Sequence, residues 1–157
     1  MKLALREARP GDERAIQQVV ADVLREYDFE TEPDGVDADL RDIQASYIAR
    51  GGTFLVLVDE AGRVVGCGGV YPFDSEIAEV RKSYLLPGVR GRGWGRTLLL
   101  RLVGDARSRG FKKLVLETAS KLVAADKLYR SVGFAEVERE HLAERCDRAM
   151  ELSLRDS

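Results

Sequence analysis

Cysteine, histidine and long apolar runs are scarce in this chain of 157 residues. The two cysteines, Cys67 and Cys146, are too few for the disulfide framework of a small secreted domain, so we expect two reduced thiols. The single histidine, His141, has no ligand pattern around it, and we assign no metal. No apolar run reaches the roughly 18 residues of a membrane span, and the first apolar stretch is too short for a signal peptide. These absences favour a cytoplasmic globular protein without a membrane partner.

The charges are unevenly distributed, although the net charge is only -2. Residues 26–42 hold eight carboxylates against one arginine, and residues 81–96 hold five cations and no acid. Such asymmetry lets one region attract a cation and another an anion, while the alternative is two solvated faces. The basic stretch is short and local, so nucleic-acid binding has little support.

Helical and strand patterns alternate along the chain. The clearest helix precedes residue 29, with apolar residues at helical spacing: Ile16, Val19, Val20, Val23, Leu24 and Tyr27. Shorter helical patterns follow through residues 40–48, through 98–106, and from an N-cap at Ser120 to Val132. Strands are expected near residues 2–8, 54–58, 64–67, 77–86, 113–117, 134–139 and 148–154. The order is βααβββαβαββ without a repeat or linker, which predicts one mixed α/β domain covering residues 1–157.

The segment from Arg90 to Arg96 connects a strand to an amphipathic helix and has glycine at every second position. The first amides of a helix are unpaired and carry a partial positive charge. Glycine allows the backbone to approach a phosphate closely, and arginine adds charge-assisted bonds. The pattern therefore predicts an anion site suited to a pyrophosphate, with a glycine-rich turn bearing solvated arginines as the alternative.

Two familiar phosphate-binding motifs fit this segment poorly. A P-loop needs Gly-Lys-Ser or Gly-Lys-Thr, which the chain lacks. A dinucleotide fingerprint needs glycine where Arg96 stands, although Glu117 ends the next strand about where a ribose-binding acid would lie. A dinucleotide-dependent oxidoreductase is therefore a distant alternative.

The same segment resembles the acetyl-coenzyme A loop of the GCN5-related N-acetyltransferases (GNAT family), whose pattern is [QR]-x-x-G-x-[GA]. Arg90, Gly93 and Gly95 occupy the defined positions, and the resemblance continues through residues 79–87 and through Tyr129-x-x-x-Gly-Phe. It covers nearly the whole chain. It implies an α+β fold with a mostly antiparallel sheet of about six or seven strands, a splayed strand pair and about four flanking helices.

The resemblance also implies a co-substrate, acetyl-coenzyme A (acetyl-CoA). Its pantetheine arm is expected in the gap beside the splayed strand, on the backbone of Ser83, Tyr84 and Leu85. The residues expected at its phosphates or adenosine are Arg90, Gly91, Arg92, Gly93, Trp94, Gly95 and Arg96, with packing beneath the loop as the simplest role of Trp94. The family often has an asparagine where this chain has Leu122, so one cofactor contact departs from the pattern.

Transfer to an amine needs a proton acceptor, because an amine of pKa about 10.4 is only about one part in 10³ neutral at pH 7, a cost of roughly 4.6 kcal/mol. Glu79 and Glu117 match positions that carry the base in different family members, and we favour Glu79. Tyr129 matches the tyrosine that protonates or hydrogen-bonds the departing thiolate. The alternatives are strand-end ion pairs for the carboxylates and simple packing for the tyrosine.

The acceptor is expected to enter opposite the cofactor, beside the acidic segment 26–42. That charge favours a cationic small-molecule or peptide amine, attacked directly in a ternary complex. Four aromatic residues are candidates for pocket walls or for core packing: Tyr27, Phe29, Tyr71 and Phe73. A CoA-binding sensory module with little activity is the alternative, suggested by Leu122. The family's frequent dimerisation extends the expectation to a homodimer.

Overall fold

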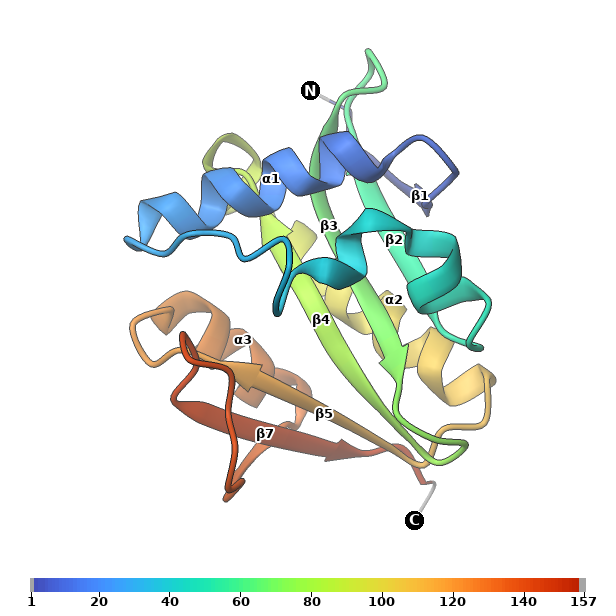
Figure 1. The fold of residues 1–157 in the computed structure, drawn as a ribbon, viewed down its shortest axis with the longest axis vertical. Helices are drawn as coiled ribbons and strands as arrows, with labels where there is room; N and C mark the ends of the chain where they lie inside the picture. Colours follow the sequence, from blue (N-terminus) through green and yellow to red (C-terminus); the bar gives the residue numbers. More distant parts are fainter. Residues whose placement is uncertain (1, 156–157) are drawn as a thin grey trace.

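The computed structural model describes residues 2–155, whose strands form a 7-stranded sheet in the order β1-β2-β3-β4-β5-β7-β6 (Figure 1). The strands are β1 (Ala4–Glu7), β2 (Thr53–Val58), β3 (Val64–Pro72), β4 (Ile77–Leu85), β5 (Lys113–Thr118), β6 (Ala135–Val137) and β7 (Arg148–Ser153). Neighbouring strands are antiparallel except for β4 and β5, which are parallel. The predicted mixed α+β fold and its order of elements are confirmed.

Helices and short helical turns cover both faces of this sheet. They are α1 (Glu13–Glu26), η1 (Ala38–Arg41), η2 (Gln44–Ile48), η3 (Pro87–Val89), α2 (Trp94–Ser108) and α3 (Val123–Val132). The second predicted helix is a 3-10 turn, η1, followed by a π turn, η2, because Asp42 between them is extended, with ψ 95°. Within residues 2–155, no helix is long and apolar enough to cross a bilayer.

The N-cap predicted for α3 was wrong. The helix begins at Val123, with Leu122 as its N-cap. The hydroxyl of Ser120 instead donates to Asp147 at 2.6 Å, and the Ser120 amide donates to the same carboxylate at 2.7 Å. These two hydrogen bonds hold the segment before α3 against the start of β7.

Strand β2 illustrates why an uninterrupted apolar run forms the centre of the sheet. Successive side chains of a strand point to opposite faces, so Phe54 and Val56 pack with α1 and η2, whereas Leu55 packs with α2. All three are fully buried. Because helices cover both faces, the strand has no polar side and reads as a continuous run.

Strands β4 and β5 pair only at their beginnings and then diverge. Ile77–Glu79 lies opposite Lys113–Val115, and no pairing of the two strands follows among the described residues. Figure 1 shows the two strands opening toward the ends of α1 and α3. A bulge in β4 accompanies the divergence, because its register with β3 shifts and Lys82 has φ +58°. A bulge bends a strand, so this irregularity directs β4 away from β5.

Candidate active site

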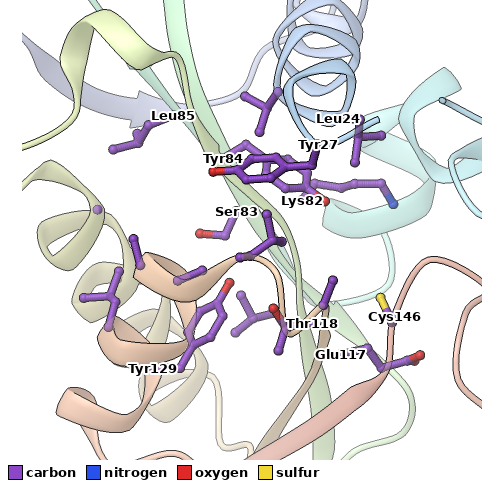
Figure 2. A pocket seen from close by; sticks show the side chains of 18 of the residues that line it. Leu24, Tyr27, Lys82, Ser83, Tyr84, Leu85, Glu117, Thr118, Tyr129 and Cys146 are labelled. Atoms are coloured by element: carbon purple, nitrogen blue, oxygen red, sulfur yellow. The ribbon is translucent and has the colours of Figure 1, made fainter. Parts of the chain in front are cut away.

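A cavity of about 340 Å³ occupies the gap between the diverging strands (Figure 2). We call it the gap cavity, and its walls come from α1, β4, β5, the start of α2, α3 and the segment before β7. The predicted residues that line it are Ser83, Tyr84, Leu85, Arg90, Gly91, Gly95, Glu117 and Tyr129. The structure therefore brings together the β4 segment, part of the glycine loop and two of the three predicted catalytic residues.

The glycine loop presents free backbone donors at the start of α2. Gly93 is the N-cap, with φ +84°, a left-handed conformation that glycine adopts readily, and no side chain caps the helix. Thr97 is the first helical residue whose amide bonds back, to the Gly93 carbonyl at 3.0 Å. The amides of residues 94–96 precede that first bond and have no intrahelical acceptor. This geometry suits the oxygens of a phosphate group.

Some predicted loop residues lie outside the gap cavity. They are Arg92, Gly93, Trp94 and Arg96. Trp94 packs instead against a small apolar cluster with Val65 and Val89. The guanidinium of Arg96 donates to the Ser131 hydroxyl at 3.1 Å and so connects α2 to α3. The simplest role expected for Trp94, packing beneath the loop, agrees with these contacts.

Arg90 is already engaged by protein groups. Its guanidinium donates to the Leu85 carbonyl at 3.0 and 2.8 Å and forms a two-pronged ion pair with Glu26 at 2.9 and 2.8 Å. The bond with Glu26 raises the pKa of Arg90 above its ordinary value, while partial burial opposes the shift. Arg90 therefore fastens the glycine loop to α1 and to the end of β4.

Tyr129 points its hydroxyl into the gap, toward Ser83 on β4 (Figure 2). It lies on α3, and its ring packs edge-on against Phe134 with centroids 5.9 Å apart. Burial raises the pKa of Tyr129 to about 12. The hydroxyl thus keeps its proton at neutral pH and is available as a hydrogen-bond donor.

A second cavity, of about 430 Å³, adjoins the gap cavity. We call it the carboxylate cavity, and it is lined by Gly35, Val36, Ala38, Asp39, Ser46, Tyr71, Glu79, Arg81 and Glu117. A small cavity of about 80 Å³ shares lining residues with both. Glu117 lines all three, whereas Glu79 lines only the small and the carboxylate cavities. Glu117 is therefore the predicted base that lines all three cavities.

Arg139, between β6 and β7, bridges the two candidate bases. Its Nη1 atom lies 3.2 Å from Glu79 Oε2 and 3.2 Å from Glu117 Oε2. The other oxygen of Glu79 accepts a bond from Arg81, and the other oxygen of Glu117 accepts one from the Ala143 amide at 2.7 Å. Both carboxylates are therefore in ion pairs, two guanidinium groups holding Glu79 and one holding Glu117.

A set of buried charged groups beside the carboxylate cavity was not predicted from the sequence. The Lys82 ammonium lies 3.1 Å from Asp39 and 3.3 Å from Asp37, and its side chain is only 5% exposed. Arg145 donates to both oxygens of Asp37 at 2.9 and 2.7 Å, and the Tyr47 hydroxyl donates to Asp39. We call these five residues the buried ion network. It fastens the β4 bulge to η1 and to the segment before β7.

These pairs change the meaning of the acidic segment. It does border the carboxylate cavity, through residues 35–39. Carboxylates of the segment are paired with cations from elsewhere or within it: Glu26 with Arg90, Asp34 with Arg41, Asp37 with Arg145 and Lys82, and Asp39 with Lys82. Several of its carboxylates are therefore in ion pairs, those of Asp37 and Asp39 being buried and that of Asp34 exposed.

The structure also shows which cavity each of five further residues lines, which the sequence patterns could not assign. Tyr27 and Phe29 line the gap cavity rather than the carboxylate cavity, as does Leu122. Tyr71 does line the carboxylate cavity. Cys146 is half-buried in the gap cavity, and burial raises the pKa of its thiol to about 11, with Glu117 acting in the same direction. This thiol is therefore protonated at neutral pH and a poor nucleophile.

Comparison with known proteins agrees with this geometry. The family model described as Acetyltransferase (GNAT) family matches residues 17–134. An uncharacterized N-acetyltransferase of Escherichia coli K12, YjgM, is 36% identical over 132 residues, covering 81% of this chain and 78% of that protein. A GNAT-family acetyltransferase structure from Staphylococcus aureus Mu50 has a TM-score of 0.92 at 19% identity, covering 98% of this chain and 100% of that one. Spermidine N-acetyltransferase from Vibrio cholerae, solved with CoA and spermine, has a TM-score of 0.71 at 23% identity, covering 97% of this chain and 95% of that one.

Proposed function

Since the chain belongs to the acetyltransferase (GNAT) family, we propose that it transfers an acetyl group from acetyl-CoA to a primary amine. One observation carries the proposal. Glu117 and Tyr129 line the same gap cavity, and Glu117 also lines the adjoining carboxylate cavity. A proton acceptor and a hydroxyl donor thus line one cavity, as acyl transfer to an amine requires. In this proposal residues 1–157 form one catalytic domain.

The gap cavity fits the co-substrate. Acetyl-CoA supplies the thioester carbonyl that the amine attacks and the thiolate that leaves. The edge of β4 from Val80 to Leu85 is unpaired with β5 and offers its backbone to the pantetheine arm. The amides of residues 94–96 and the surface arginine Arg92 offer donors to the phosphates. The solved neighbour from Vibrio cholerae was crystallised with CoA.

Proton removal from the acceptor is assigned to Glu117, with Glu79 as the second candidate. The amine arrives as an ammonium ion and must lose a proton before it attacks the thioester. Glu117 is the more accessible of the two, with 19% of its side chain exposed against 6% for Glu79. It also lines the gap cavity, which Glu79 does not. These differences reverse the preference that the sequence alone supported.

Stabilisation of the leaving thiolate is assigned to Tyr129. A phenol with a pKa of about 12 does not protonate a thiolate of ordinary pKa, near 8.5, at equilibrium. Its hydroxyl instead stabilises the developing charge on sulfur by a hydrogen bond. Direct attack by the amine is supported because the thiol in the cavity, Cys146, stays protonated and so is a poor covalent intermediate.

The test is CoA release from acetyl-CoA, followed with a thiol reagent, against a panel of amines, amino acids, polyamines, aminoglycosides and lysine peptides. Tyr129→Phe is expected to lower kcat by about 10- to 100-fold, since a hydrogen bond to a charged group contributes about 1.5–3 kcal/mol. The affinity for CoA should change little, which calorimetry measures.

Ser131→Ala is a matched control, because this hydroxyl lies two residues further on α3 and contacts Arg96. CoA binding without acceptor-dependent release would favour a CoA-binding module. Absence of CoA binding would contradict the proposal.

A further inference from the structure

Three arginines and two aromatic rings pack together beside the carboxylate cavity. The rings of Tyr71 and Phe73 lie 6.0 Å apart, edge to face. The Arg81 guanidinium carbon lies 3.7 Å from the Tyr71 centroid and 5.7 Å from that of Phe73. Arg50 lies 4.3 Å from the Tyr71 centroid, and Arg139 lies 5.6 Å from the Phe73 centroid. We call these five residues the arginine–aromatic cluster.

Two arginines of this cluster retain donors for a ligand. Arg81 lines the carboxylate cavity and uses its Nε atom on Glu79, which leaves its terminal nitrogens without a hydrogen-bond partner among residues 2–155. Arg50 is exposed, and in the described part of the chain it forms no ion pair or side-chain hydrogen bond. Stacking on Tyr71 holds both guanidinium groups in place at little further entropic cost. The free terminal nitrogens of Arg81 in the carboxylate cavity suit a carboxylate ligand, and Arg50, stacked on the same ring, adds a second positive charge nearby.

The charges around the carboxylate cavity change during the reaction. Glu79, Glu117, Asp37 and Asp39 are paired with Arg81, Arg139, Lys82 and Arg145, and Arg145 also lies 4.0 Å from Glu32. Arg50 forms no ion pair among residues 2–155, so its positive charge stays free beside the cavity. When a carboxylate takes the proton of the acceptor ammonium, the protein side gains another. A carboxylate on the acceptor offsets this charge, whereas a second ammonium increases it.

We propose that the acceptor carries a carboxylate close to its amine, as a free amino acid does, and that Arg81 and Arg50 bind this carboxylate. The inference rests on the proposed function, because it names the substrate class of the same site. Arg81 lines the carboxylate cavity together with Glu117, the assigned proton acceptor, and is bonded directly to Glu79, the second candidate. An amine and a carboxylate on the same carbon can therefore reach a proton acceptor and Arg81 together.

The test compares matched acceptors in the wild type and in Arg50→Gln. The pairs are leucine with isopentylamine, phenylalanine with phenethylamine, and lysine with 1,5-diaminopentane. The members of a pair differ in basicity, so the informative quantity is the change in their kcat/KM ratio between wild type and variant, in which basicity cancels. Arg50→Gln is expected to lower the amino-acid to amine ratio by about 10-fold, as the loss of one charged contact predicts. Arg50→Glu should lower it further and favour 1,5-diaminopentane.

Arg63→Gln is the matched control, because Arg63 is also exposed but lies in the turn before β3, whereas Tyr71 is near the other end of that strand. It should leave the ratio unchanged. An unchanged ratio in Arg50→Gln, or a wild-type preference for polyamines that Arg50→Glu does not increase, would overturn the proposal.

A binding experiment distinguishes failure of this proposal from failure of the proposed function. Calorimetry measures leucine, phenylalanine and lysine binding to the CoA-saturated protein, without any turnover. If no acceptor is acetylated but an amino acid binds, and binds about 10-fold more weakly to Arg50→Gln, the carboxylate site stands while the transferase proposal fails. If amines are acetylated but no amino acid binds the CoA complex, the carboxylate site fails while the transferase proposal stands.

Discussion

Glu117→Gln is expected to lower kcat by about 10²- to 10⁴-fold, the usual contribution of a positioned general base. Glutamine has nearly the same shape, and its carbonyl oxygen can still accept the Ala143 amide that Glu117 binds at 2.7 Å. It cannot accept the proton of the acceptor ammonium. Steady-state CoA release with the best acceptor of the panel measures the loss, and calorimetric CoA affinity is expected to remain within about 3-fold, because the change removes no cofactor contact.

The pH profile distinguishes a base from a structural carboxylate. Without the base only acceptor that is already neutral can react, so the loss in Glu117→Gln should shrink as the pH rises toward the amine pKa of about 10.4. Glu79→Gln is the direct comparison, with a smaller expected loss because Glu79 does not line the gap cavity. Glu151→Gln is the neutral control, since Glu151 is on β7 and pairs with Lys113 at 3.5 Å. If Glu79→Gln shows the larger loss and the recovery at high pH, and Glu117→Gln shows neither, the assignment of the base reverses.

Features encoded by neighbouring residues could be predicted from the sequence. The apolar period of α1, the apolar run of β2 and the turn at Gly62 each depend on local spacing, and all appear in the structure. The glycine loop was also predictable, because its chemistry resides in consecutive residues before α2. The divergence of β4 and β5 was predicted only through the family resemblance, because no local pattern marks where a strand loses its partner.

Contacts between distant residues could not be predicted. Lys82 is 43 residues from Asp39, and Arg145 is 108 residues from Asp37. Their charges were visible in the sequence, but the partner of each depends on how η1 and the segment before β7 fold over the β4 bulge. The acidic segment was therefore interpreted as an open negative surface, although several of its carboxylates are in ion pairs and those of Asp37 and Asp39 are buried. A run of like charges in a sequence predicts an electrostatic field at the surface only where the fold leaves those charges unpaired.

Lys82→Met is expected to lower the free energy of unfolding by about 3–5 kcal/mol, the typical cost of removing one partner of a buried ion pair. The Lys82 side chain is 5% exposed and that of Asp39 is 6% exposed, so both charges are largely shielded from bulk water. Among residues 2–155, Asp39 would retain the Tyr47 hydroxyl as its one side-chain donor, while Asp37 would keep both bonds from Arg145. Methionine is unbranched and of similar length, and both residues pay the same backbone cost at φ +58°. Urea unfolding at pH 7 measures the difference.

The double variant Lys82→Met/Asp39→Asn tests the cause of that loss. Asparagine removes the uncompensated charge, so the double variant should be more stable than Lys82→Met alone, with an interaction energy of about 0.5–3 kcal/mol between the two sites. Equal stability of the single and double variants would contradict an electrostatic origin and leave packing as the explanation. Stability measured against pH gives an independent check, because a buried carboxylate without its cation binds a proton more readily in the folded state than in the unfolded state. The deficit of Lys82→Met relative to wild type should therefore be full at pH 7 and shrink as the pH falls toward about 4.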